Sequence, residues 1–245
     1  MMPHHPIITD AAPLPRGRAD RPLVIELAGL AGAGKSSITR ALGRLDPTIH
    51  ARPRVSLRWH LVSLPALLPT FVGLHWPFRG VLSKEMKRIL RLRALHRLVH
   101  RTRGGGALVF DEGPVYMLAR ILFFGGRNIE TEAFARWWRR AIARWTATLD
   151  VIVWLHAPDD VLAARIHTRQ QRHRYQGADD QALTAFLNGY RAAFARVLTE
   201  LTVAGGPQLW TLATDRGSAD VQARELLDRL RTPGATARQP RQIAV

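Results

Sequence analysis

Cysteine is absent from this sequence and lysine is scarce, whereas arginine is abundant. Without cysteine the protein can have no disulfide, no catalytic thiolate and no cysteine-ligated zinc. The only lysines are Lys35, Lys84 and Lys87, although Lys and Arg together number 36 against 19 Asp and Glu. The resulting formal net charge of +17 favours partners rich in negative charge, such as phosphorylated ligands, anionic lipid or nucleic acid.

The chain ends lack features of targeting or packing. No apolar segment of the kind found in secretory signals occurs in residues 1–21, so we expect a cytoplasmic protein. Residues 1–21 and 232–245 are expected to be flexible tails. Residues 22–231 are long enough to form one α/β domain with a substantial core.

Apolar runs alternate with amphipathic segments along the chain, and this pattern indicates a parallel sheet with helices on both faces. Strands are expected at 22–29, 54–59, 106–113, 149–158 and 207–214. Helices are expected at 34–45, 80–103, 114–124, 130–147, 159–173, 179–203 and 218–231.

A glycine-rich loop follows the first expected strand. Its sequence, GLAGAGKS at 29–36, fits the P-loop pattern G-x-x-x-x-G-K-[ST]. Such loops direct backbone N–H groups at phosphate oxygens, with help from the dipole of the following helix. Lys35 can reach the β- and γ-phosphates, and Ser36 can hold Mg²⁺. The expected ATP-binding residues are Gly29, Leu30, Ala31, Gly32, Ala33, Gly34, Lys35, Ser36 and Ser37.

Two acidic residues, Asp111 and Glu112, end the strong apolar run that precedes them. Functional groups gather at the carboxyl ends of strands in a parallel sheet. Asp111 can bind Mg²⁺, and either acid can accept the proton of an acceptor hydroxyl. Their side chains should diverge, and both could also cap the helix that starts at Pro114.

Three arginines, Arg165, Arg169 and Arg172, share one face of an expected helix. No acidic residue falls between Arg165 and Gly177, so these guanidinium groups have no local partner. They can supply positive charge to a migrating phosphoryl group, and Gly177 would help the segment move as a lid. An ordinary solvated basic face is the alternative.

Taken together, the glycine loop, FDEGP at 110–114 and VIVWLHAPDDVLAARIHTR at 151–169 resemble the P-loop kinase superfamily that includes thymidylate kinase and the deoxynucleoside kinases. LWTLATDRGSAD at 209–220 resembles the last strand of these kinases and the turn near the adenine. The resemblance implies a three-layer α/β fold with a five-stranded parallel sheet in the order 2-3-1-4-5 and an arginine lid. It also implies ATP and Mg²⁺ as cofactors and a small acceptor.

Two positions differ from the family pattern. Thymidylate kinases usually carry an acidic residue in the loop where this chain has Ala31. In the family an arginine that meets the acceptor follows the strand-end acid, whereas Glu112 stands there in this chain. Because a carboxylate repels a phosphate at close range, the sequence favours a neutral hydroxyl acceptor such as a sugar, a nucleoside or a lipid-like alcohol.

Residues 59–78 contain no charged side chain. Their three prolines argue against a single membrane-spanning helix, and in this fold the stretch would line an apolar acceptor pocket. Residues 79–103 are typical either of a core helix with a solvated basic face or of a helix that meets anionic lipid. Contact of residues 59–103 with the inner membrane surface is therefore an alternative. A homodimer is a separate expectation that no residue pattern supports or excludes, and no nucleic-acid-binding module is recognisable.

The sequence thus predicts an ATP-dependent kinase that transfers the γ-phosphate to a hydroxyl group of a small acceptor. The alternative is a P-loop ATPase or a nucleotide-regulated binding protein at a membrane surface or on nucleic acid. A kinase fold that serves only as an interaction protein is a third reading, and intact Lys35, Ser36 and Asp111 argue against it.

Overall fold

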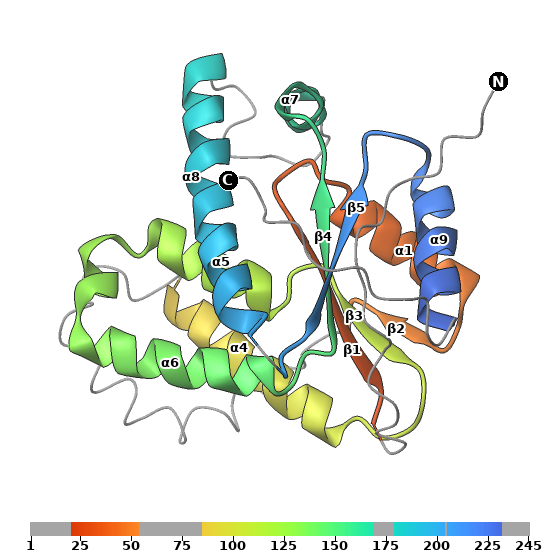
Figure 1. The fold of residues 1–245 in the computed structure, drawn as a ribbon, viewed down its shortest axis with the longest axis horizontal. Coiled ribbons are helices and arrows are strands. Elements are labelled where there is room, and N and C mark those ends of the chain that lie inside the picture. The colour runs from red at the N-terminus through yellow and green to blue at the C-terminus, as the bar shows by residue number, and fades with distance from the viewer. Residues whose placement is uncertain (1–20, 54–84, 169–178, 204, 232–245) are drawn as a thin grey trace.

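In a computed structural model, the protein forms a five-stranded parallel sheet between two layers of helices (Figure 1). The structure describes residues 21–53, 85–168, 179–203 and 205–231. The strands are β1 (Leu23–Gly29), β2 (Ile49–Ala51), β3 (Ala107–Phe110), β4 (Val151–His156) and β5 (Gln208–Ala213). Their order in the sheet, β2-β3-β1-β4-β5, is the order that the sequence predicted.

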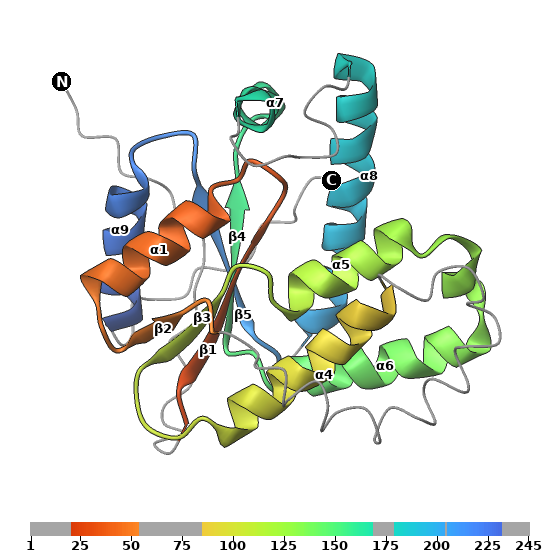
Figure 2. The same ribbon diagram turned by 180° about the vertical axis from the view of Figure 1, so that it is seen from behind.

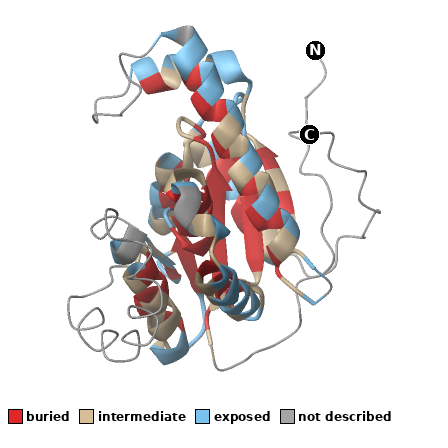
Figure 3. Ribbon diagram, turned by 90° about the vertical axis from the view of Figure 1, so that its left-hand side faces the viewer, coloured by how far each residue is buried: buried red, intermediate tan, exposed pale blue. Residues whose placement is uncertain are grey.

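The central strand β1 is buried on both faces, as its continuous apolar sequence requires. Ile25 lies opposite Val109 of β3 on one side and opposite Val151 of β4 on the other. All three side chains are buried, so the middle of the sheet forms the core (Figure 3).

Helices cover the sheet on both sides. They are α1 (Lys35–Leu45), α4 (Glu85–Arg101), α5 (Pro114–Phe124), α6 (Glu132–Thr146), α7 (Asp159–His167), α8 (Asp180–Leu201) and α9 (Ala219–Arg231), with a 3₁₀ turn at Gly126–Glu130. Helices α1 and α9 lie on one side, and α4, α5, α6 and α8 lie on the other (Figures 1 and 2). Helix α7 stands beyond the carboxyl end of β4.

The edge strand β2 differs from the sequence-based expectation. It is Ile49–Ala51, whereas the expected second strand at 54–59 lies outside the described residues. Three residues are too few for an alternating or continuous apolar pattern to reveal a strand. Pairing with β3, in which Ala51 lies opposite Val109, therefore identifies this strand where local sequence does not.

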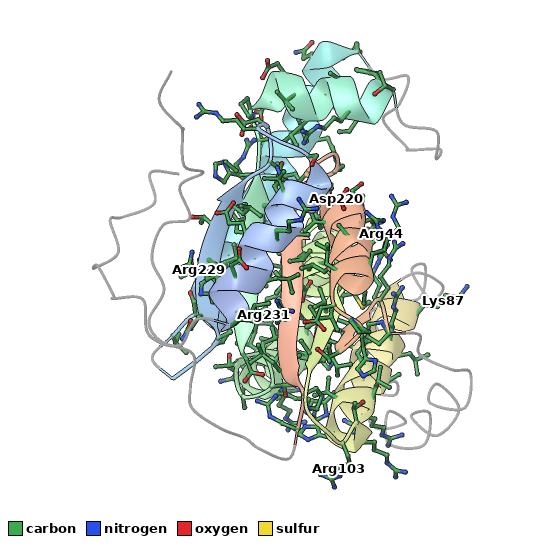
Figure 4. All side chains as sticks on the ribbon, turned by 90° about the vertical axis from the view of Figure 1, so that its right-hand side faces the viewer. Arg44, Lys87, Arg103, Asp220, Arg229 and Arg231 are labelled. Carbon is green, nitrogen blue, oxygen red and sulfur yellow. The ribbon has the colours of Figure 1, made fainter. Side chains whose placement is uncertain are left out.

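Helix α4 is a core helix with a basic outer face. Its apolar residues Ile89, Leu92, Leu95 and Val99 are buried, whereas Lys87 is exposed and points away from the protein (Figure 4). The apolar side of this helix is therefore occupied by the core.

The charge-free stretch 59–78 lies outside the described residues. Within the part of the chain that is described, no helix combines the length and the apolar character needed to cross a membrane.

Helix α9 packs beside α1 on the opposite side of the sheet. Arg44 Nη2 of α1 lies 2.7 Å from Asp220 Oδ1 of α9, and Figure 4 shows the two residues at adjacent helix ends. Such exposed ion pairs contribute little to stability. The buried faces of the helices, with Ile38 and Leu42 on α1 and Leu226 on α9, provide most of the stabilisation.

One charged residue, Glu26, lies fully buried in β1 and caps helix α5. Its Oε2 accepts a hydrogen bond from the backbone N–H of Val115 at 2.8 Å, and its Oε1 accepts one from that of Tyr116 at 2.9 Å. The helix needs this cap because Gly113 before it has no side chain and Pro114 has no N–H. A Cβ on Gly113 would lie 2.6 Å from Glu26 Oε2, so only glycine leaves room for the carboxyl group.

The pKa of Glu26 makes the stability of the protein pH-dependent. Burial raises this pKa from 4.5 to about 8, against the opposing effect of the N–H groups of Tyr116 and Val115. The folded state thus retains a proton that the unfolded state has lost at pH values between these two pKa values. The associated stability is fully present below the unfolded pKa and is lost as the pH rises through the folded pKa.

We expect the free energy of unfolding to fall by a few kcal/mol between pH 5 and pH 8 relative to that of Glu26→Gln, at about 1.4 kcal/mol per pH unit. Urea denaturation of both proteins across this pH range measures the difference. Glu26→Gln should itself be less stable at pH 5, because an amide NH₂ would face a backbone N–H. Curves that run parallel from pH 5 to pH 8 would contradict the raised pKa.

Candidate functional site

The glycine loop joins β1 to α1 at the carboxyl end of the sheet. Gly32 and Gly34 have φ angles of 82° and 84°, in the left-handed region that glycine adopts without strain. A Cβ on Gly32 would lie 2.9 Å from the carbonyl oxygen of Leu162, so α7 approaches the loop backbone closely. The sequence therefore sets both the curvature of the loop and the distance to its neighbouring helix.

Lys35 begins helix α1 and folds back over the loop. Its Nζ donates hydrogen bonds to the carbonyl oxygens of Gly29 and Leu30, each at 2.7 Å. The ammonium group thus lies on the concave side of the loop. An ammonium in this position can turn from the carbonyl oxygens to phosphate oxygens.

Ser36, Asp111 and Arg52 form a small polar network beside the loop. Ser36 Oγ donates to Asp111 Oδ2 at 2.8 Å, and Arg52 Nη2 lies 2.7 Å from the same carboxylate oxygen. The Asp111 side chain is only 7% exposed, because it follows β3 directly and points across to α1. The structure thus brings together Ser36 and Asp111, which are 75 positions apart in the sequence.

Arg52 was not among the residues that the sequence suggested. It directly follows β2, its N–H donates to the carbonyl oxygen of Val109 at 3.0 Å, and its φ angle is 56°. A non-glycine residue in this conformation costs about 1–2 kcal/mol. Such an outlier beside the glycine loop is a reason to look for a function, and no local sequence signal marks it.

The network suits a magnesium ion bound together with a nucleotide. Mg²⁺ prefers hard oxygen ligands and is usually held by one or two protein groups together with substrate phosphates and water. The hydroxyl of Ser36 and the carboxylate of Asp111 provide two such groups within 2.8 Å of each other. Elsewhere among the described residues, no cluster of three or more His, Asp or Glu side chains could hold a metal ion.

Glu112 points away from Asp111 and towards helix α4. Its Oε2 lies 3.5 Å from Arg91 Nη1, and its side chain is 48% exposed. The two adjacent acids thus diverge, as expected for consecutive residues after a strand. Asp111 is buried against the loop, whereas Glu112 remains accessible beside it.

Further along α5 and on α8, aromatic and basic side chains form a second group of contacts. Arg120 Nη1 donates to the Tyr116 hydroxyl at 2.9 Å, and its guanidinium lies 4.9 Å from the centre of the Phe124 ring. The Phe123 ring lies 5.3 Å from that of Tyr190 on α8. Burial raises the pKa of Tyr190, so its hydroxyl stays protonated.

Arg165 is the one member of the expected arginine lid within the described residues, since Arg169 and Arg172 lie outside them. From α7, its guanidinium donates to the carbonyl oxygen of Thr214 at 2.7 Å and to that of Gly32 at 3.2 Å. It therefore ties the glycine loop to the end of β5. Thr214 belongs to the segment 209–220 that the resemblance marked, whereas Arg91 and Arg120 carried no signal in the sequence that would have marked them.

No protein-family model matches this chain. No curated protein matches it either.

Structural comparison does find similar proteins. The thymidylate kinase of Candida albicans superposes with a TM-score of 0.51 over 86% of this chain and 92% of its own, at 14% identity. The deoxyadenosine kinase of M. mycoides with products dCMP and dCDP superposes with a TM-score of 0.50 over 85% of this chain and 98% of its own, at 12% identity.

The chain has the fold of the P-loop kinases. This finding confirms the α/β class and the five-stranded parallel sheet inferred from the sequence. The arginine lid and the roles of individual residues stay predictions.

Proposed function

We propose that the protein is a kinase that transfers the γ-phosphoryl group of ATP to a hydroxyl group of a small acceptor. One observation carries this proposal. Ser36 on the glycine loop contacts Asp111, which directly follows the adjacent strand β3, and Lys35 and Glu112 are the sequence neighbours of these two residues. A phosphate-binding loop and a pair of acids at one edge of a parallel sheet are what phosphoryl transfer requires.

The glycine loop would bind the phosphates of ATP through its backbone N–H groups and Lys35. Ser36 and Asp111 would hold Mg²⁺, which when bound supplies positive charge to the β- and γ-phosphates. Arg165, together with the lid residues Arg169 and Arg172, would neutralise charge on the phosphoryl group in transit. Transfer is favoured over the alternative P-loop ATPase because the similar folds are those of a thymidylate kinase and a deoxyadenosine kinase.

The difference in burial between the two acids suggests different roles. Asp111, buried against Ser36, suits the metal, whereas the accessible Glu112 suits the acceptor. The Glu112 carboxylate would accept the proton of the acceptor hydroxyl as general base. The acceptor oxygen then forms a bond to the γ-phosphorus, and the bond from that phosphorus to the bridging oxygen of ADP breaks.

We propose a neutral acceptor. The Arg91–Glu112 pair carries no net charge, so an anionic acceptor gains nothing from it. Tyr116 and Arg120 lie on α5, the helix that follows Glu112, and could donate hydrogen bonds to hydroxyl or carbonyl oxygens of the acceptor. The acceptors to test in an assay of ADP release are therefore nucleosides, sugars and long-chain alcohols. Nucleoside monophosphates serve as the anionic comparison.

Lys35→Ala should reduce acceptor-dependent release of ADP by about 100-fold or more, because the phosphates lose their ammonium partner. The melting temperature should stay within a few degrees of that of the wild type. Lys87→Ala, which removes an exposed lysine from α4, is the matched control and should retain full activity. Full activity in purified Lys35→Ala would contradict the kinase assignment. Slow ATP hydrolysis at the same rate with every acceptor would support an ATPase.

Asp111→Asn and Glu112→Gln should affect different steps. The first should raise the Mg²⁺ concentration needed for half-maximal rate by about tenfold, since an amide is a poorer metal ligand than a carboxylate. The second should lower kcat by about 100-fold and leave the Mg²⁺ dependence unchanged, as expected for a general base. Arg91→Gln controls for loss of the ion pair and should change kcat less than Glu112→Gln. If Glu112→Gln instead changed the Mg²⁺ dependence and Asp111→Asn lowered only kcat, Glu112 would be the metal ligand and Asp111 the general base.

We further propose that helix α4 meets anionic membrane through charge alone, since its apolar side is buried. Residues 86–110 and 133–149 contain no acid. Burial and the charge of Arg93 on α4 lower the pKa of Arg144 on α6, so positive charge from both helices acts in one region. Figure 4 shows Arg103 just beyond the carboxyl end of helix α4.

Salt-sensitive co-sedimentation with phosphatidylserine vesicles tests this contact. The double variant Arg93→Gln/Arg144→Gln should bind them less, by about 1 kcal/mol per arginine. Arg44→Gln/Arg231→Gln on α1 and α9 should bind as the wild type does. Equal binding to uncharged phosphatidylcholine vesicles, or equal loss in both double variants, would refute the contact.

A further inference from the structure

Arg52 connects two oxygens that a magnesium ion would also need. Its Nη2 lies 2.7 Å from Asp111 Oδ2 and 3.2 Å from Ser36 Oγ, while these two oxygens are themselves 2.8 Å apart. One nitrogen thus contacts both members of the pair. The arginine comes from the end of β2, the serine from α1 and the aspartate from the end of β3.

A guanidinium and a divalent cation compete for such a site. Both require the lone pairs of the same two oxygens, and their positive charges repel each other at short distance. The arginine is able to leave, because its side chain is 46% exposed. Asp111 is only 7% exposed, and the guanidinium of Arg52 neutralises its charge when no metal is bound.

We propose that Arg52 is a positioning residue that occupies the metal-binding oxygens of Ser36 and Asp111 until magnesium arrives with the nucleotide and displaces it. This inference rests on the proposed nucleotide site. The local backbone supports it, because the hydrogen bond from the N–H of Arg52 to the carbonyl oxygen of Val109 fixes the residue in its left-handed conformation. The side chain therefore starts from a defined position beside the loop.

Two consequences follow for binding. Without magnesium, Arg52 shields the phosphates of a nucleotide from the negative charge of Asp111, so the protein binds nucleotide in the absence of metal. With magnesium, the guanidinium must first leave, so Arg52 adds nothing to affinity and opposes binding of the metal. The ratio of the nucleotide Kd in EDTA to the Kd in Mg²⁺ therefore depends on the charge at position 52.

Calorimetric titration of the full-length protein with ADP, once in EDTA and once in excess Mg²⁺, measures this ratio. Arg52→Gln should raise it by about tenfold, through weaker binding in EDTA and equal or tighter binding in Mg²⁺. Arg52→Lys keeps the charge and should stay close to the wild type. Arg44→Gln removes an arginine from α1 away from the site and should leave both Kd values unchanged.

Arg52→Gly separates the side chain from the backbone. Glycine adopts a φ of 56° without strain, so this variant should fold with an unchanged or higher melting temperature. Its Kd ratio should nevertheless match that of Arg52→Gln. The proposed competition between Arg52 and magnesium would be wrong if both variants lost affinity equally in EDTA and in Mg²⁺. It would also be wrong if neither variant changed the Kd ratio. If the wild-type protein binds ADP in neither condition, the proposed kinase site itself is wrong and this inference falls with it.

Discussion

The buried carboxyl group of Glu26 holds together the two halves of the candidate site. It lies three residues before Gly29, where the glycine loop begins, and it caps the helix that begins three residues after Asp111. Displacement of that carboxyl group would separate the loop from the strand-end acids. Gly113 is part of the same constraint, since any side chain there would occupy the position of the carboxyl group. An ionisable group is thereby kept in the centre of the sheet, and stability depends on its proton.

Arginines from separate elements distinguish the two adjacent acids. Asp111 is buried and contacts Arg52 from the end of β2, whereas Glu112 is half-exposed and contacts Arg91 of α4. A third arginine, Arg165, joins α7 to the loop and to the end of β5. Arginine is abundant throughout the chain. These three arginines differ from the others in the carboxylate or carbonyl oxygens that they contact. Each contact joins two elements that the sequence separates widely, so the charges also help to hold the site in one arrangement.

The similarity to two kinases of 12% and 14% identity indicates how few residues this fold requires. What must be kept is a buried parallel sheet, a glycine loop after its central strand and polar residues at one edge. The region around Tyr116, Arg120 and Tyr190 is built from side chains that the fold does not dictate. Specificity for an acceptor would depend on such residues, because they lie outside the shared framework.

The sequence alone determined four of the five strands, the helices, the glycine loop and the position of Asp111 after a strand. These features depend on short-range patterns: apolar runs, helical periodicity and a motif of eight residues. Glu26 was visible as a single acid in an apolar strand, but its partner on α5 was not. The second strand, the Arg52 contact with Ser36 and Asp111, and the Arg91–Glu112 pair were decided by the tertiary structure. Each depends on chain segments that meet only when the sheet forms, and residue spacing along the sequence carries no information about such meetings.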